Sequence, residues 1–259
     1  MAVECDIVLL CGDGESSRAV YHALAGKFGS MSVVMEQGPS RMKMYRRRCK
    51  TLGWRVVFGQ LCFLLGIVPW MKRCSFKRSR ELQDLYQLDI TSIPTESVDR
   101  VASVNAEDCR QLLARLQPKV VVVNGTRIIG KKTLGCCDAT FINTHHGITP
   151  TYRGVHGGYW ALAEGKPEDV GSTIHLVDEG IDTGGAIRYV HFEIAPNDNF
   201  TTYPIHHIGT AIPKIAETVQ AILAGQELPR EDSSGRRTCL RSHPTVFQYL
   251  YYRFSKSVK

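Results

Sequence analysis

The chain has 259 residues, of which 43% are hydrophobic and 22% charged, and a formal net charge of +7. A chain of this size can bury a core without covalent staples, and an odd count of nine cysteines cannot pair completely, which argues against a disulfide-built secreted protein. Because the first residues carry Glu4 and Asp6 and no basic leader segment, we expect a cytoplasmic protein with free thiols.

The first predicted element is a strand that leads into a glycine-containing turn. Residues 6–11 form a short apolar run without polar alternation, which is typical of a strand buried on both faces. A helical pattern follows through Ala25, as at the start of a nucleotide-binding βαβ unit. Backbone N–H groups at such a helix start favour phosphate, although two acids in the turn would repel it unless they point outward. The turn is predicted to contact the substrate through Gly12, Asp13, Gly14, Glu15 and Ser16, with a plain strand–helix turn as the alternative.

Residues 40–90 are basic and apolar, and we predict that they form a helical insertion. Lys and Arg cluster in residues 43–50 and 72–80, and such clusters attract phosphates, nucleic acid or an anionic membrane surface unless they are simply solvated helix faces. The uncharged run 56–71 is shorter than the about 20 residues of a spanning helix. We expect a buried or surface-capping helix there, with an interfacial membrane anchor as the alternative.

The remaining elements alternate in type and define the fold class. Beyond residue 171 the pattern changes to a pair of strands around a turn, a helix and a packed aromatic tail. The pattern predicts an α/β, Rossmann-like, mostly parallel sheet with helices on both faces. We assign residues 1–195 to one catalytic domain, with the insertion at about 40–90, and residues 196–259 to a C-terminal helical extension packed on it. Strands are expected at 32–35, 101–104, 119–123, 139–143, 173–177 and 186–194, and helices from an Asn105 cap to about Leu116 and over 203–223.

Three polar residues are the strongest catalytic candidates. Asn143 and His145 end an apolar run two residues apart, so on a strand they project to the same face, beyond which ligands of such folds bind. An imidazole can move protons at physiological pH, and an amide N–H₂ can stabilise an oxyanion. Asp182, in a Gly-rich turn, could orient the imidazole or hold a water. Each residue alone has an ordinary structural explanation, as a turn former or a packed histidine.

The longer string around these residues resembles the 10-formyltetrahydrofolate-dependent formyltransferases, which include glycinamide ribonucleotide, methionyl-tRNA and nucleotide-sugar formylating enzymes. That family carries an Asn-x-His signature, then Pro with a nearby Gly, then a loop that closes in Asp-x-Gly. Here these are Asn143 to His145, Pro150 to Gly154 and Asp178 to Gly184, and the match covers about residues 117–195. Ile148-Thr149-Pro150 departs from the family's usual Leu-Leu-Pro, and a second histidine, His146, follows the signature.

The resemblance implies roles for the site residues. Asn143 would bind the formyl oxygen, His145 would serve in acid–base or oxyanion chemistry, and Asp182 would organise His145 and water. 10-Formyltetrahydrofolate would be the co-substrate, and the family needs no metal. By position, the folate would lie against two backbone-rich walls, formed by Thr126, Arg127, Ile128 and Ile129 and by Val177, Asp178, Glu179, Gly180 and Ile181.

The sequence therefore predicts a cytoplasmic N-formyltransferase that acts on a small-molecule primary amine. A glycinamide ribonucleotide-like acceptor, and thus purine biosynthesis, is favoured by the N-terminal turn, and the amine of a nucleotide sugar or glycolipid precursor is the next choice. The tail after residue 195 is too short for an added tRNA-binding barrel, so no specific nucleic-acid partner is expected. A formyltetrahydrofolate hydrolase stays open, as does a non-catalytic protein that contacts a membrane or partner through the basic insertion.

Overall fold

A seven-stranded sheet forms the centre of the computed structural model, which describes residues 5–38 and 40–259. The strand order is β3-β2-β1-β4-β5-β7-β8. The pairs from β3 to β5 are parallel, and β7 and β8 add an antiparallel edge, so the predicted mostly parallel sheet is confirmed. The strands are β1 (Ile7–Gly12), β2 (Ser32–Glu36), β3 (Val98–Val101), β4 (Val120–Asn124), β5 (Thr140–His145), β7 (Gly171–Leu176) and β8 (Ala186–His191).

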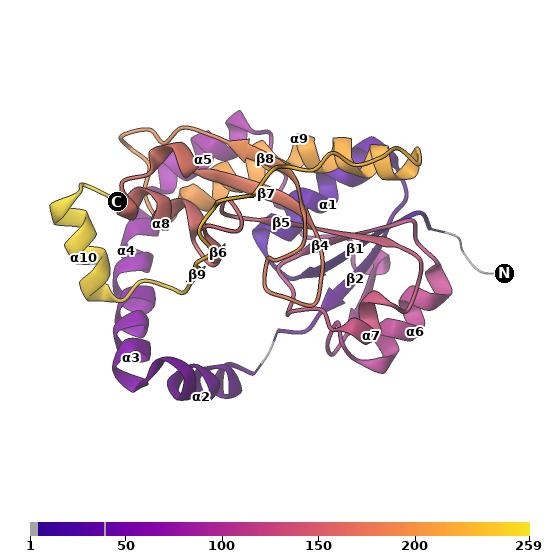
Figure 1. Ribbon diagram of the computed structural model, residues 1–259, viewed down its shortest axis with the longest axis horizontal. Helices are drawn as coiled ribbons and strands as arrows, with labels where there is room; N and C mark the ends of the chain where they lie inside the picture. The colour runs from indigo at the N-terminus through magenta and orange to yellow at the C-terminus, as the bar shows by residue number, and fades with distance from the viewer. Residues whose placement is uncertain (1–4, 39) are drawn as a thin grey trace.

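Helices cover both faces of this sheet (Figure 1). On one face lie α1 (Glu15–Phe28) and α9 (Tyr203–Leu223); on the other lie α6 (Glu107–Leu116) and the short α7 (Lys131–Leu134). Alternate residues of β1 therefore enter two different cores: Ile7 and Leu9 pack in the core under α1 and α9, and Val8 and Leu10 in the core under α6. This double covering explains why the strand has no polar alternation.

Two local predictions need correction. The strand expected at residues 101–104 is β3, at Val98–Val101, because its register against β2 pairs Glu36 with Val101 and the chain then turns away. Asn105 is not the helix cap, since Ala106 holds that position. The Asn105 side chain instead accepts a hydrogen bond from the N–H of Gly130 (2.7 Å) and donates one to the Ile128 carbonyl (2.8 Å), so it fixes the loop after β4.

A helical arm, defined as residues 41–74, leaves the sheet between β2 and β3. It comprises α2 (Arg41–Leu52), α3 (Trp54–Cys62), a π-helical turn η1 (Phe63–Ile67) and α4 (Val68–Cys74). From Trp54 to Cys74 the last three are continuous, a stretch of 21 residues with a mean hydropathy of 1.5 that is long and apolar enough to cross a membrane, by length and composition alone. α5 (Phe76–Leu85) returns the chain to the body.

The C-terminal helix α10 (Val246–Ser255) packs against this arm, on the side of the molecule away from α6 and α7 (Figure 1). Gly59 allows the close approach, since a Cβ there would lie 3.0 Å from Cβ of Thr245. The Gln60 side chain donates to the His243 carbonyl (2.7 Å), and Phe63 packs on Tyr249. The remaining short elements are β6 (Arg153–Gly154), α8 (Gly157–Glu164), β9 (Leu240–Arg241), η2 (Thr95–Ser97) and η3 (Pro167–Asp169).

Candidate active site

The end of β5 brings an imidazole and a carboxylate together. His145 Nδ1 lies 3.3 Å from Asp182 Oδ2, and His145 Nε2 lies 2.6 Å from the carbonyl oxygen of Tyr152. A carbonyl oxygen only accepts hydrogen bonds, so Nε2 carries a proton and donates it to Tyr152. Nδ1 is therefore the ring nitrogen that faces the carboxylate of Asp182. His145 is buried, which shields this pair from bulk water.

The loop that carries Asp182 joins β7 to β8 and is anchored by β6. The backbone N–H of Gly154 donates to Asp182 Oδ2 (3.0 Å), and Arg153 Nε donates to the Ile181 carbonyl (2.8 Å). Asp182 itself has a φ of +52°, in the left-handed region that Asp and Asn tolerate better than most residues. The turn predicted around Asp182 is therefore present, and its backbone aims the carboxylate at His145.

A second histidine, His175, completes the cluster and was not among the predicted site residues. It faces Asn143 across the β5–β7 pair. His175 Nδ1 donates to the Leu176 carbonyl (2.7 Å), and burial lowers the pKa of His175, although the charge of Asp182 partly opposes this shift. Its Nε2 is then an acceptor for the amide of Asn143, 3.1 Å away. His175 Nε2 also lies 3.8 Å from Asp182 Oδ1, so Asn143, His145, His175 and Asp182 form one group.

This contact fixes the amide of Asn143. One of its two N–H hydrogens is given to His175, which leaves the second free to point at a reacting oxygen. The signal in the sequence was the period of two along residues 171–176, which places Thr173 and His175 on one side of the strand. The strand register needed to set His175 opposite Asn143 could not be read from the sequence.

Small residues and hydroxyl groups shape the turn after His145. A Cβ at Gly147 would lie 2.5 Å from the Tyr152 carbonyl and 2.9 Å from His145 Nε2, so a larger residue would break the contact between these two groups. The Thr173 hydroxyl donates to the Gly147 carbonyl (2.7 Å) and accepts from the Thr149 N–H (3.0 Å). The turn is thereby locked to β7, the strand that also carries His175.

The first predicted folate wall, residues 126–129, is a loop held by a buried carboxylate. Glu36 accepts hydrogen bonds from the N–H of Arg127 and of Val104, both at 2.9 Å, and its carboxylate lies 3.3 Å from Arg127 Nη1. Thr126 donates to the Arg127 carbonyl, Ile128 exposes 49% of its surface, and Ile129 is buried. Glu36 was not predicted as a site residue, because nothing in the sequence links the end of β2 to this loop.

The second predicted wall, residues 177–181, is a turn closed by its own side chains. Val177 donates its N–H to Phe141, and Asp178 accepts from the N–H of Gly180 and the Thr183 hydroxyl. Glu179 lies 3.9 Å from Lys131, which follows the first wall in the chain. The two walls are thus neighbours near the same edge of the sheet.

The N-terminal turn joins β1 to α1, and its polar side chains pair with residues of α1 and β4. Asp13 pairs with Arg18 at 2.9 Å, and the hydroxyl groups of Ser16 and Ser17 donate to the Asn124 side chain. A cavity of about 660 Å³ is lined by this turn together with Glu36, Arg100, Thr126 and Arg127. Because Asp13 and Ser16 are already paired with Arg18 and Asn124, this turn offers a phosphate mainly the backbone at Gly14, the N-cap of α1.

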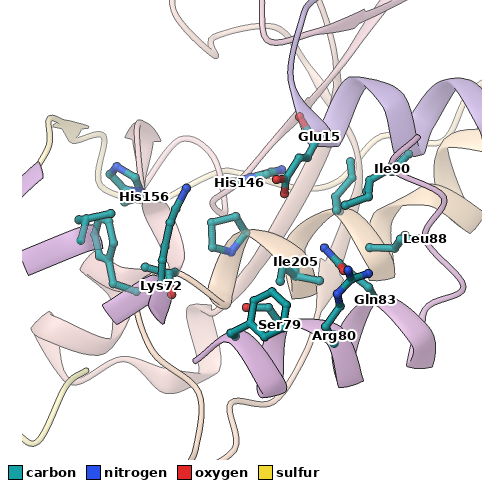
Figure 2. Close-up of a pocket in the computed structure, with 18 of the residues that line it drawn as sticks. Glu15, Lys72, Ser79, Arg80, Gln83, Leu88, Ile90, His146, His156 and Ile205 are labelled. Atoms are coloured by element: carbon teal, nitrogen blue, oxygen red, sulfur yellow. The ribbon is translucent and has the colours of Figure 1, made fainter. Parts of the chain in front are cut away.

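A second, mixed cavity, of about 620 Å³, opens beside His146 (Figure 2). His146 stacks on His207, while His145 contacts Tyr152 and Asp182, so the two adjacent rings face different surroundings. The charged residues that line the cavity are one acid, Glu15, and two cations, Lys72 and Arg80. Its apolar lining comes from the arm, α5, α9 and the segments next to them and includes Leu64, Val68, Phe76, Leu88, Phe200 and Ile208.

Around this cavity, buried histidines form a neutral cluster. Burial lowers the pKa of His146 to about 4 and of His156 to about 3, and it also lowers the pKa of His207 well below its ordinary value. His156 and His243 share a hydrogen bond of 2.8 Å. Within residues 5–38 and 40–259, no group of three or more His, Cys, Asp or Glu side chains is arranged to hold a metal ion.

Comparison of the sequence with known families gives a match to the family described as formyl transferase, over residues 75–206. A methionyl-tRNA formyltransferase from Chlorobium chlorochromatii (strain CaD3) is 28% identical over 148 residues, which are 56% of this chain and 46% of that protein. One from Anaeromyxobacter sp. (strain K) is 32% identical over 130 residues, 50% of this chain and 41% of that protein. The chain spans about half the length of the curated relatives it matches.

Solved structures resemble the fold. A sugar N-formyltransferase from Shewanella sp. FDAARGOS_354 superposes with a TM-score of 0.56 at 14% identity, covering 89% of this chain and 75% of that one. Phosphoribosylglycinamide formyltransferase from Streptococcus pneumoniae TIGR4 superposes with a TM-score of 0.50 at 18% identity, covering 85% of this chain and 99% of that one. An N-formyltransferase from Helicobacter canadensis, in complex with folinic acid and dTDP-3-aminofucose, superposes with a TM-score of 0.53 at 13% identity. The match covers 90% of this chain and 70% of that one. At these identities the likeness concerns the fold, and the predicted fold class is confirmed.

Proposed function

The chain belongs to the formyl transferase family, and on this premise we propose that it moves a formyl group from 10-formyltetrahydrofolate to a primary amine. The observation that carries the proposal is the group of four side chains at the end of β5. His145 lies beside Asp182, and Asn143 is oriented by His175. These groups supply the two things that formyl transfer needs: a proton carrier and a donor to the developing oxyanion.

The proposed reaction is an addition followed by an elimination. The amine nitrogen attacks the formyl carbon, and the formyl oxygen becomes an oxyanion that accepts the second N–H of Asn143. The bond between the formyl carbon and N10 of the folate then breaks. The attacking nitrogen must lose one proton and N10 must gain one, and we assign this transfer to His145 with Asp182. Tyr152, by accepting from Nε2, holds the ring so that Nδ1 faces the carboxylate.

The folate donor is proposed to lie between the two walls at residues 126–129 and 177–181. Ile128 exposes an apolar side chain against which a flat pterin ring could pack, and Glu36 holds the backbone of that wall in place. The second wall belongs to the same loop that positions Asp182. Placing the donor there would put its formyl group beside Asn143.

For the acceptor, the cavity of Figure 2 favours an amphipathic, anionic amine over glycinamide ribonucleotide. Lys72 and Arg80 could bind a phosphate, and the apolar lining suits hydrocarbon. Glycinamide ribonucleotide has no hydrocarbon to fill such a lining. In the turn at residues 12–16 that suggested this acceptor, Asp13 and Ser16 are already paired with Arg18 and Asn124. An amino sugar on a glycolipid precursor combines a primary amine, phosphate and hydrocarbon.

The test is a turnover assay that follows formation of tetrahydrofolate from 10-formyltetrahydrofolate with a panel of amines. The panel would hold lipid-linked and nucleotide-linked amino sugars, glycinamide ribonucleotide and methionyl-tRNA. We expect turnover that depends on the acceptor and is fastest with the lipid-linked amine. Turnover without any amine would instead establish a hydrolase, and no turnover with any acceptor would remove the proposal.

A pair of variants separates the acceptor assignment from the chemistry. Arg80→Ala should raise KM for an anionic acceptor at least about tenfold, because it removes one charge-assisted contact, and leave kcat within about twofold. Arg230→Ala, an exposed position outside the cavity, is the matched control. Equal KM values in the two variants would place the acceptor elsewhere.

A further inference from the structure

The arm and α10 expose apolar side chains in regular stripes. On the arm, Trp54, Phe58 and Leu65 recur at spacings of four and seven residues, and Trp54 is 67% exposed. On α10, Phe247, Tyr251 and Phe254 recur at spacings of four and three residues, and Phe254 is 80% exposed. At 100° per residue they lie on the side of α10 opposite the buried Tyr249. Trp70 adds a further exposed aromatic near the end of the arm.

The two stripes belong to one lobe of the molecule. The arm and α10 meet through their buried sides, where Tyr249 donates its hydroxyl hydrogen to Met71 Sδ (3.2 Å) and packs on Phe63. Figure 1 shows α10 beside the arm at the end of the molecule away from α6 and α7. Large exposed apolar areas on a folded protein mark a surface that another body covers.

The two segments that carry this lobe contain Lys and Arg without Asp or Glu, and Arg78, Arg236 and Arg241 among them are paired with acids from other segments. Residues 37–80 contain 12 of the 32 Lys and Arg, residues 233–259 contain six more, and neither segment has an Asp or Glu. The rest of the chain therefore holds the other 14 Lys and Arg against all 25 Asp and Glu. Exposed cations flank both stripes, for example Arg46 and Arg47 on α2 and Arg73 and Lys77 near the arm's end.

We propose that the arm and α10 together form a docking face for an anionic lipid bilayer. Aromatic residues with Lys and Arg beside them are the composition of a helix that lies in the headgroup region. A second copy of this chain is disfavoured as the occupant, because two faces without any acidic residue in these segments would repel each other. The arm does not cross the bilayer, since Val57, Phe63 and Met71 on it are buried against the protein.

The experiment is co-sedimentation of the full chain with vesicles. One set is phosphatidylcholine alone, and the other contains about one-third phosphatidylglycerol. We expect at least about tenfold stronger binding to the anionic vesicles, and most of that gain should be lost at about 0.5 M salt, because salt screens the headgroup charge. This readout needs no substrate, so it stands whether or not formyl transfer is found.

Two aromatic double variants and their control test the stripes. Trp54→Ser with Phe58→Ser, and Phe247→Ser with Phe254→Ser, should each weaken binding at least about tenfold. Leu85→Ser is the control, since Leu85 is 66% exposed but lies at the far end of α5. All of these positions are on the surface, so circular dichroism and melting should be close to those of the parent.

Charge reversal gives the second arm of the test. Arg73→Glu with Lys77→Glu should weaken binding to anionic vesicles at least about tenfold, while Arg230→Glu should have little effect. Absence of vesicle binding by the parent chain would overturn the proposal. So would aromatic variants that bind as the parent does, a dimer that those variants dissociate, or binding of tRNA in place of vesicles.

Discussion

The end of β5 and the helical arm use side chains in opposite ways. At β5, polar groups are drawn inside: His145 and His175 are buried, and each has hydrogen-bond partners that fix its orientation. On the arm, aromatic groups are left outside, on a helix whose other side is packed. The difference shows which of the two regions depends on exact side-chain positions. The sheet register and the lack of a side chain at Gly147 fix the contacts of the first region, whereas the second region requires only exposed aromatic side chains with cations beside them.

The largest expected effect is acid destabilisation of the buried histidine cluster beside β5. The folded-state pKa values of His146 and His243 are lowered from 6.5 to about 4, and that of His156 to about 3. The unfolded chain therefore binds more protons, and stability present above pH 6.5 is lost as the pH falls toward 4, by roughly 2 kcal/mol per ring at pH 5. Urea unfolding at pH 7 and pH 5 measures this; equal stabilities would show that the rings are not held neutral.

Removing the proton carrier should stop the chemistry and leave the fold. His145→Ala and Asp182→Asn are each expected to lower turnover at least about 100-fold, because general acid–base assistance contributes about that much. The melting temperatures should stay close to that of the parent. Rates within a few-fold of the parent in both variants would remove these residues from the proposed mechanism.

The junction between α5 and the body can be tested without touching the site. Asp198 is buried, and although burial alone would raise its pKa, hydrogen bonds from His206 and Arg78 hold the pKa below its ordinary value. Arg78→Met should lower the free energy of unfolding by about 2 kcal/mol, a value discounted because Arg78 is partly exposed. Arg80→Met, two residues on, is the control. An equal loss in both would mean that the ion pair contributes nothing.

The smallest expected effect concerns His175 as a positioning residue. His175→Phe removes the acceptor for Asn143 and should lower kcat about tenfold with KM nearly unchanged. In the double variant with Asn143→Ala, the second substitution should cost little more, because both act through one amide. His175→Gln keeps a side-chain acceptor and should recover part of the rate. Independent, additive losses would mean that His175 does not act through Asn143.

The sequence predicted the first region far better than the second. The parallel strands, the turn at Asp182 and the helix α9 followed from apolar runs and glycine positions. The sequence could not provide the register between strands. It therefore missed His175 and Glu36, because both act through contacts with segments that are distant in the chain. For the run 56–71 the sequence predicted a helix but not which of its side chains are exposed, because an apolar helix has the same composition whether those side chains are buried or exposed. Only the packing of α10 reveals which side of the arm is left free.

The left-handed backbone at residue 182 has an evolutionary consequence. Asn accepts this conformation nearly as well as Asp and has almost the same shape. A duplicated gene could therefore lose the proposed activity through one substitution and keep the fold, along with any binding surface on it. Homologues with Asn at this position are expected to be inactive proteins that persist for their binding partners.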